Sequence, residues 1–467
     1  MRVSTIADPI PASGAPADGG HARLALPLCL GFGVGSFGIA ILLNVVTVLF
    51  PAMMTTVLGQ SAALAGLLLT FSKLYDIGAD IGIGAASDRT RTRIGRRRPY
   101  LLFGAVVAGL SFLMIFMPPK LTGTPLTLWM AFALVVYSTG YSLFSVPYMA
   151  MAGEMTDGYH ERTRLLSFRT FFISVGQLAS SAGAAALIGW LGGGSVGYAV
   201  MGAVGGALLC AAMMVSFFGT RNARTMPAAP KMRISRRELV STLSSNRPFV
   251  LLMTIKLSQY AAIAMISTTK VLFLLNIVKV GYAGLVNLTL IQNIVGVAVI
   301  PLWVWLGRKI GKRPAYLLAT AILGMVYISW FFADANITLS GIWIRGAANG
   351  VAAAGTTLLS VAMLPDVMEY DRRRTGLRRE GVFSSVYSIV EKLGYALGAG
   401  IIGVILSSSG FIPTLQGKLV SQPHSAVLAL YGGASLIPAA LIAFSWLLML
   451  AYPLDEKMLR QTQLISA

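Results

Sequence analysis

The chain has 467 residues, of which 56% are hydrophobic and only 12% are charged. A water-soluble globule of this size needs far more polar surface, so the composition excludes an ordinary soluble domain and indicates that lipid is the solvent for most of the chain. A net charge of +20 is also typical of nucleic-acid-binding proteins. The positions of the cations along the chain, described below, argue against that class.

Apolar stretches of about 20 residues, long enough to cross a bilayer as helices, recur from end to end. We expect helices rather than a barrel, because lipid-exposed backbone must satisfy its own hydrogen bonds and no alternating segments of roughly ten residues occur. The sequence predicts twelve spans: 25–50, 61–86, 99–118, 126–151, 168–191, 196–218, 248–276, 281–306, 314–333, 337–364, 382–409 and 425–452.

The spans form two related halves. A dense basic loop, Asp88–Pro99, follows the second span, and a similar loop, Gly307–Pro314, follows the eighth. This offset is the one expected of two six-helix repeats, an architecture typical of carriers that work by alternating access. The predicted organisation is a disordered tail (1–22), a first bundle (23–218), a linker (219–247), a second bundle (248–453) and a second tail (454–467).

The cations are distributed asymmetrically between the loops. Arg and Lys are clustered in the loops after the even-numbered spans, whereas the loops after the odd-numbered spans hold only Lys120, Lys279 and Lys418. The positive-inside rule therefore predicts a multi-pass protein of the inner membrane with both termini in the cytoplasm. The lipid bilayer, and not nucleic acid, is the expected partner of the positive charge. We expect a monomer.

Few charges lie inside the spans, where an ion is retained only if it is paired, hydrated or used. Asp76 and Asp80 are four residues apart in span 2, which puts both carboxylates on one helix face. Because like charges repel, the pair is expected to hold a monovalent cation or a proton. Lys73 lies one turn earlier, and Lys392 follows Glu391 in span 11.

Two arrangements of these charges remain open. If only Lys392 meets the acids, one negative charge is left for H⁺ or Na⁺ to balance. Alternatively, Lys73 and Lys392 together neutralise both acids in a fixed network.

Other polar residues within the spans are candidates for substrate contacts. Tyr148 in span 4 could stack on a ring, although an aromatic residue in a helical bundle also serves packing. Lys256, Gln259 and Asn293 in spans 7 and 8 could bind hydroxyl groups, and interhelical hydrogen bonds explain them equally well. Lys270, near the outer end of span 7, has no assigned role, and its long side chain could reach the interface.

The basic loop after span 2 is a candidate gate. It contains Asp88, Arg89, Gly95 and Arg96. The carboxylate of Asp88 could cap a helix end or bridge to a neighbouring helix during a conformational change. The alternative is that these cations only set the topology.

Two stretches carry a family resemblance. Residues 73–102, from Lys73 through the paired acids and the basic loop, and residues 366–381 before span 11 resemble segments of the glycoside-pentoside-hexuronide:cation symporters of the major facilitator superfamily. The resemblance covers all the predicted spans. It implies an all-α membrane protein with twelve transmembrane helices in two pseudo-symmetric six-helix bundles, the major facilitator fold.

The resemblance also implies roles for single residues. Asp76 and Asp80 match the family's cation-binding aspartates, Lys73 and Lys392 match its basic residues, and Ser142 matches a hydroxyl ligand of the cation. The implied cation-binding set is Asp76, Asp80, Ser142 and Ser145, with Lys73, Lys392 and Glu391 as charge partners.

The sugar-binding part departs from the family pattern. Arg169 matches a sugar-contacting arginine, but Gly38 and Ser145 each replace an aspartate, and Met149 replaces a stacking tryptophan. The cation half of the site is therefore retained better than the sugar half, which favours a less hydroxylated or differently charged substrate over galactosides. The candidate substrate-binding residues are Arg169, Tyr148, Lys256, Gln259, Asn293 and Lys392.

The predicted function is secondary active transport, in which H⁺ or Na⁺ drives symport of a sugar or glycoside-like small molecule by alternating access. Ser145 replaces an aspartate of the family pattern, so the site has one anionic oxygen donor fewer for Na⁺, and this favours H⁺ over Na⁺ as the coupling ion. No cofactor beyond the coupling ion is expected, and no enzyme is expected because His21, His160 and His424 lie near termini or loops and no catalytic motif accompanies them. Uniport, an amphiphile or lysolipid carrier of the same fold, and a non-transporting membrane sensor or assembly protein remain alternatives.

Overall fold

The computed structural model describes residues 24–156, 159–223, 246–375, 380–418 and 420–454. Within these ranges, twelve helices are long and apolar enough to cross a membrane. This confirms the predicted number of spans and the all-α fold. The predicted tail over 1–22, most of the linker and nearly all of the second tail lie outside the described residues.

The first half contains seven labelled α-helices that make six spans. They are α1 (Leu26–Thr56), α2 (Ala62–Arg89), α3 (Arg98–Phe116), α4 (Gly123–Glu154), α5 (Tyr159–Leu178), α6 (Ala184–Trp190) and α7 (Ser195–Gly219). A π-helical turn, η1 (Ala179–Gly183), joins α5 and α6 into one span. Such turns insert a residue into the helical ladder and are frequent at functional sites.

The second half repeats this pattern. Its helices are α9 (Arg247–Asn276), α10 (Gly281–Ala298), α11 (Ile300–Ile310), α12 (Lys312–Ser329), α13 (Leu339–Thr375), α14 (Glu380–Ser408), α15 (His424–Tyr431) and α16 (Ile437–Leu450). α11 continues the line of α10 after a break at Val299, η2 (Trp330–Phe332) extends α12, and the π-helical turn η3 (Gly432–Leu436) joins α15 to α16.

Helix ends follow local chemistry where the sequence allows. The side chain of Ser61 caps α2 by accepting a hydrogen bond from the Leu64 N–H, and Asn246 caps α9 in the same way through Phe249 N–H. α13 continues well past residue 364, where the sequence pattern ends the span, and carries Pro365 inside the helix. Three arginines in its last turn oppose the negative end of the helix dipole, which favours this extension.

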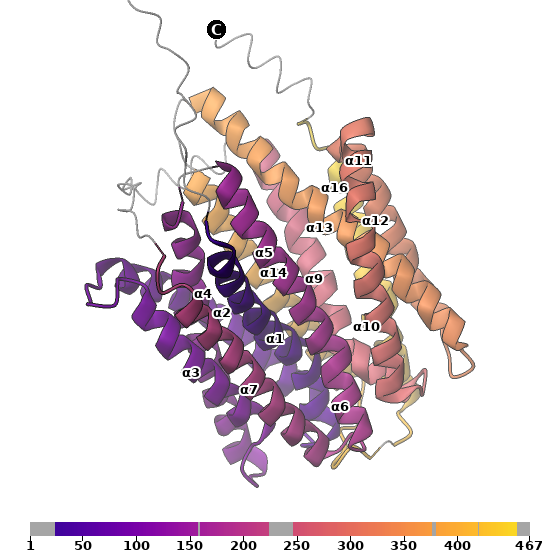
Figure 1. Ribbon diagram of the computed structural model, residues 1–467. Helices are drawn as coiled ribbons and strands as arrows, with labels where there is room; N and C mark the ends of the chain where they lie inside the picture. The colour runs from indigo at the N-terminus through magenta and orange to yellow at the C-terminus, as the bar shows by residue number, and fades with distance from the viewer. Residues whose placement is uncertain (1–23, 157–158, 224–245, 376–379, 419, 455–467) are drawn as a thin grey trace, which may run out of the picture.

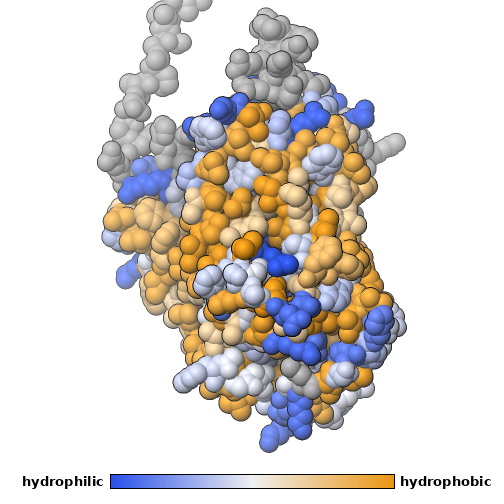
Figure 2. Space-filling view, turned by 90° about the vertical axis from the view of Figure 1, so that its right-hand side faces the viewer, coloured by the Kyte–Doolittle hydropathy of each residue, from blue (hydrophilic) through white to orange (hydrophobic). Residues whose placement is uncertain are grey.

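The two halves lie side by side (Figure 1), and α2 and α14 form the most extensive contact between them. Figure 2 shows the side formed by the later helices, where hydrophobic residues cover most of the surface and hydrophilic residues lie toward the two ends and in a smaller group near the middle. This distribution suits a protein surrounded by lipid across its middle. Charged groups inside the bundle must therefore find partners within the protein.

The two ends of the bundle differ, and we name them by their loops. The basic end is the one at which α2 leads into α3 and α11 leads into α12; the opposite end carries the loop between α1 and α2. At the opposite end, backbone hydrogen bonds join the halves: Thr414 N–H donates to Thr55 O (2.7 Å), Gly417 N–H to Thr56 O (2.9 Å) and Gln416 N–H to Val57 O (3.1 Å).

Small residues bring α2 and α14 together near this end. A Cβ atom on Gly66 would lie 2.4 Å from Ala399 O, and one on Gly403 would lie 2.6 Å from Ala62 O. Only glycine permits this approach of the two backbones, a device common between membrane helices. The hydroxyls of Tyr198 on α7 and Tyr282 on α10 add a hydrogen bond of 2.8 Å between the halves. The opposite end is therefore closed.

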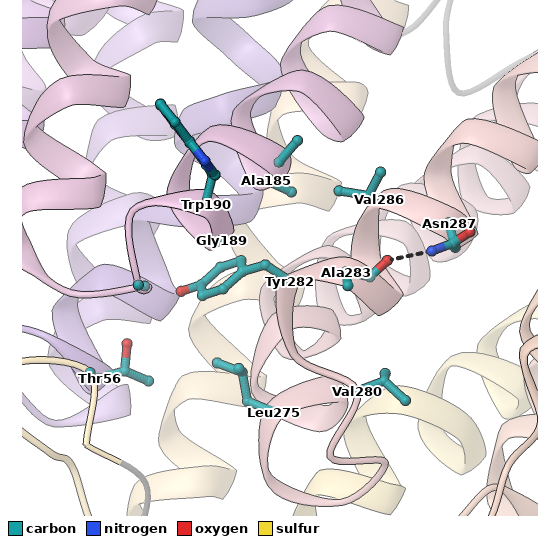
Figure 3. Close-up of a pocket in the computed structure, with 14 residues that line it drawn as sticks. Thr56, Ala185, Gly189, Trp190, Leu275, Val280, Tyr282, Ala283, Val286 and Asn287 are labelled. Atoms are coloured by element: carbon teal, nitrogen blue, oxygen red, sulfur yellow. Dashed lines mark hydrogen bonds between the residues drawn. The ribbon is translucent and has the colours of Figure 1, made fainter.

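A cavity of about 590 Å³ lies beside this closure. Figure 3 shows the ring of Tyr282 on its wall, extending from α10, the helix that also carries Val286, toward the chain around Gly189. Its other lining residues include Trp190, Leu275 and Val280, and none of its lining residues carries a charge. The charged residues predicted to form the site line a different cavity.

Candidate ion and substrate site

A second cavity, of about 520 Å³, lies between the halves and contains most of the charged residues of the spans. It is lined from the first half by α1, α2, α4, α5 and η1, and from the second half by α9, α10 and α14. Its charged lining residues are Lys73, Asp76, Arg169, Lys270, Glu391 and Lys392. We call it the central cavity.

Asp76 is the most deeply buried acid of this cavity, with a side chain only 1% exposed. Lys73, one turn earlier on α2, donates a hydrogen bond of 3.3 Å to Asp76 Oδ2 and lies over the ring of Tyr137, with 5.4 Å between the ammonium nitrogen and the ring centroid. Asp76 Oδ1 has no hydrogen-bond partner within the described part of the chain. An unpaired buried carboxylate oxygen is an available ligand for a proton or a small cation.

Asp80, one turn further along α2, joins three helices. It accepts hydrogen bonds from the Ser142 hydroxyl on α4 (2.6 Å) and from the Lys392 ammonium on α14 (2.5 Å). Lys392 also donates to the backbone carbonyl of Asp76 (3.2 Å), so this one lysine contacts both residues of the acidic pair. The pair Asp80–Lys392 crosses from the first half to the second.

These contacts correct the expected charge of the pair. The interpretation in which one negative charge is left over is wrong for this conformation, because Lys73 pairs with Asp76 as well as Lys392 with Asp80. The alternative arrangement, two acids neutralised by two lysines, is the one observed. Coupling to a cation then requires that the cation displace a lysine or that a lysine leave during a conformational change.

Three further predicted residues line the central cavity. Arg169 approaches from α5, and its Nε is buried without a hydrogen-bond partner among the described residues. Asn293 on α10 donates to Thr289 O (2.8 Å) and, across the halves, to the Ser181 hydroxyl (3.4 Å). Glu391 lines the cavity from α14, and no ion pair links it to another described residue.

Tyr148, a predicted substrate contact, is not among the residues that line the central cavity. Its side chain is fully buried inside the first half, where it stacks on Phe32 with ring centroids 4.3 Å apart. Its hydroxyl donates to Phe32 O (2.6 Å) and is hydrogen-bonded to the hydroxyl of Ser36 (2.7 Å). Packing, the alternative, explains this residue.

Lys256 and Gln259 also lie away from the central cavity. The Lys256 ammonium is buried within the second half, where it donates to Gln259 Oε1 (2.7 Å) and to the Ser360 hydroxyl on α13 (2.9 Å). It lies over the ring of Tyr260, 4.5 Å from the centroid. Hydrogen bonding within the second half is the arrangement observed, and neither residue belongs to the lining of the central cavity.

Ser145 is buried on α4, one turn from Ser142, and is bonded to neither acid among the described residues. Its placement alone does not make it a ligand.

Sequence reasoning missed several polar groups of the cavity wall. Asn44 on α1 donates to the Ser180 hydroxyl in η1 (2.8 Å), and Tyr141 on α4 lies under the Lys392 ammonium, 5.6 Å from its ring centroid. Asn44 is the one amide side chain in the mostly apolar predicted span 25–50, and this was its signal in the sequence. The π-helical turn that presents Ser180 has no comparable signal in the sequence.

The loop after α2 forms an ion cluster within the first half. Arg97 donates to Asp88 Oδ1 (3.1 Å) and to Glu154 Oε1 (2.7 Å), and Arg96 also pairs with Glu154. Gly95 has a positive φ of 106°, which glycine adopts without strain. Arg89 is exposed. The prediction named the loop but not Arg97 and Glu154, which join α2, α3 and α4.

The second half has a smaller counterpart. Lys312, at the start of α12, pairs with Asp366 on α13 (2.7 Å), and Gly311 has a φ of 92°. The repeated basic loops therefore tie neighbouring helices together inside each half.

Comparisons with known proteins agree with this architecture. The family described as MFS/sugar transport protein matches residues 31–456. Among curated relatives, a glucuronide carrier protein homolog of Escherichia coli is 26% identical over 87% of this chain and 88% of its own, and an isoprimeverose transporter of Lactiplantibacillus pentosus is 25% identical over 86% and 83%. An uncharacterized symporter of Synechocystis is 25% identical over 91% and 94%.

Solved structures share the fold at low identity. The nucleoside transporter NupG superimposes with a TM-score of 0.62 at 13% identity, covering 91% of this chain and 98% of its own. A bacterial homolog of the human lysosomal transporter Spinster gives 0.65 at 16%, covering 94% and 97%. The family match over residues 31–456, which is most of the chain, shows that it belongs to the MFS/sugar transport protein family.

Proposed function

We propose that the protein is a symporter that couples entry of H⁺ or Na⁺ to transport of a sugar or glycoside-like small molecule by alternating access. The relatives named as symporters and sugar carriers support this function over the amphiphile carrier and the sensor. The observation that carries the proposal is the pair Asp80–Lys392, which links an acid of the first half to a cation of the second half beside the central cavity.

The proposed orientation follows the cations. We place the basic end and both termini in the cytoplasm, because the loops at that end hold nearly all the loop arginines and lysines. The closed opposite end then faces the outside, and the conformation is one in which a substrate in the central cavity has no outward route through the closure of α1, α2 and α14.

Coupling can be derived from the same pair. A cation that binds Asp80, with Ser142 as a second oxygen ligand and Asp76 nearby, competes with the ammonium of Lys392. Its binding removes a contact between the halves, and separation of the halves frees Asp80 to bind a cation. Ion binding and conformation are thereby linked, which is the requirement for coupled transport.

Uptake into proteoliposomes tests this function. A panel of radiolabelled sugars and uronic acids is assayed at two Na⁺ concentrations and two pH values, for the wild type, Asp80→Asn and the control Asp334→Asn, which changes an exposed acid outside the cavity. We expect that a Na⁺ or pH gradient drives accumulation in the wild type and the control, and that Asp80→Asn loses it. Gradient-driven accumulation by Asp80→Asn equal to the wild type would exclude the proposed coupling.

A further inference from the structure

The charges of the central cavity do not cancel. Its lining includes four cations and two acids, and Asp80 joins the set through Lys392. The pairs Lys73–Asp76 and Lys392–Asp80 account for two cations and two acids. Arg169 and Lys270 then face a single remaining acid, Glu391, so the cavity carries one positive charge in excess when all these groups are ionised.

Lys270 has no partner within the described ranges that explains its position. It lies on α9, and its side chain lines the central cavity rather than the outer surface of the bundle. Among the described residues, neither a hydrogen bond nor an ion pair reaches its ammonium, and Ser267, one turn earlier on α9, lines the cavity with it. The suggestion that Lys270 extends to the membrane interface does not fit a side chain directed into the protein interior.

An excess cation in a cavity at membrane depth is unfavourable by several kcal/mol unless an anion or water compensates it. A neutral sugar supplies no compensating charge. Binding of the coupling cation at Asp80 adds a further positive charge to the same cavity, which increases the need for a counter-charge.

We infer that the transported molecule carries a single negative charge, as a carboxylate or sulfonate on a polyhydroxylated body, and that Lys270 binds that group. Arg169, which likewise has no hydrogen-bond or ion-pair partner in the described part of the chain, lines the same cavity and adds to its positive potential. Hydroxyl groups of the substrate have partners in Asn293 and Gln292 on α10 and in Ser181 of η1, which line the same wall. This inference rests on the proposed symport and adds the substrate class to it.

A matched series of ligands tests the inference directly. Glucose, glucuronate, 6-deoxy-6-sulfoglucose and glucose 6-phosphate share a ring and differ in the group at one position. Uptake into proteoliposomes is expected for glucuronate, the sulfonate or both, at rates at least about tenfold above glucose. The dianionic phosphate is expected to be a poor substrate, because it overcompensates the single excess charge.

Variants of Lys270 assign the anion to this residue. Lys270→Gln is expected to raise the KM for the preferred anion by about 10- to 100-fold, the effect of losing one charge-assisted hydrogen bond. Lys270→Arg should retain most of the affinity because it keeps the charge. Lys120→Gln, which removes an exposed loop lysine, serves as the control and should leave the KM unchanged.

The outcomes separate the inference from the proposed function. Gradient-driven uptake of glucose equal to that of its anionic analogues, or an unchanged KM in Lys270→Gln, overturns the anion site and leaves the symport standing. Calorimetric binding of glucuronate to the purified protein that requires Lys270, without gradient-driven uptake, supports the anion site and rejects the symport. A KM effect restricted to the anions and rescued in Lys270→Arg supports both.

Discussion

The two ends of the molecule use different chemistry to hold helices together. At the basic end, ion pairs connect helices of the same half, as in the cluster of Arg97 with Asp88 and Glu154 and in the pair Lys312–Asp366. At the opposite end, backbone hydrogen bonds and glycine contacts connect the two halves to each other.

This difference suggests a division of labour. Ion pairs within a half keep each bundle rigid as it moves, whereas contacts between halves must break whenever the opposite end opens. Backbone hydrogen bonds and glycine contacts act only at short range, so they vanish together when the halves separate by a small distance. The pair Asp80–Lys392 combines the two kinds of contact. It is an ion pair, like the contacts at the basic end, and it connects the two halves, like the contacts at the opposite end.

The largest effect is expected at the basic end, in stability. Arg97→Gln removes the cation that joins Asp88 to Glu154, and breaking a buried ion pair from one side costs about 3 kcal/mol. We expect a clearly lower thermal midpoint of the detergent-solubilised protein. Arg89→Gln, which changes an exposed arginine of the same loop, is the matched control and should leave the midpoint unchanged. Equal midpoints in the two variants would show that the cluster does not hold α2, α3 and α4 together.

The sequence predicted the spans well, because span length and apolar composition depend on the bilayer and not on which neighbour a helix meets. The pairing of Asp76 with Lys73 was accessible from helical spacing. The family resemblance named Ser142 and Lys392 as members of the site, but only the structure shows that both donate hydrogen bonds to Asp80.

The sequence could not say which way a polar side chain in an apolar span points. Lys256 and Lys270 illustrate this, because they are the two lysines of α9. Lys256 donates hydrogen bonds to Gln259 and Ser360, whereas Lys270 lines the central cavity. The same ambiguity misplaced Tyr148. Which residues face a cavity depends on how the helices pack against each other, and local spacing carries no information on that.

A smaller effect is expected at the glycine contact of the opposite end. Gly66→Ala places a Cβ atom 2.4 Å from Ala399 O, and because that atom belongs to the backbone of α14, the helices must separate. Overpacking of this kind costs about 2 kcal/mol, which favours an open opposite end by roughly 30-fold. The measurement is the rate at which a membrane-impermeant maleimide labels Thr56→Cys in a background without Cys29 and Cys210.

The matched control lies on the same helix. A Cβ atom on Gly78 has no neighbour within 4 Å, so Gly78→Ala should leave the labelling rate unchanged. If the two glycine variants label alike, the contact between α2 and α14 does not set the closure, and the proposed difference between the two ends is lost.

The smallest effect is expected at the hydrogen bond between Tyr198 and Tyr282, because a single neutral hydrogen bond contributes about 1 kcal/mol. Tyr198→Phe leaves the Tyr282 hydroxyl without its partner and should raise labelling at Thr56→Cys by about fivefold. The double variant, with both tyrosines changed to phenylalanine, should label more slowly than the single variant, because no buried hydroxyl is then left unpaired.

The control is a hydrogen bond within one half. Tyr431→Phe loses a hydrogen bond to Ala333 O within the second half and should have no effect on labelling. Should Tyr431→Phe accelerate labelling as much as Tyr198→Phe, the closure would depend on general packing of the second half, and not on bonds between the halves.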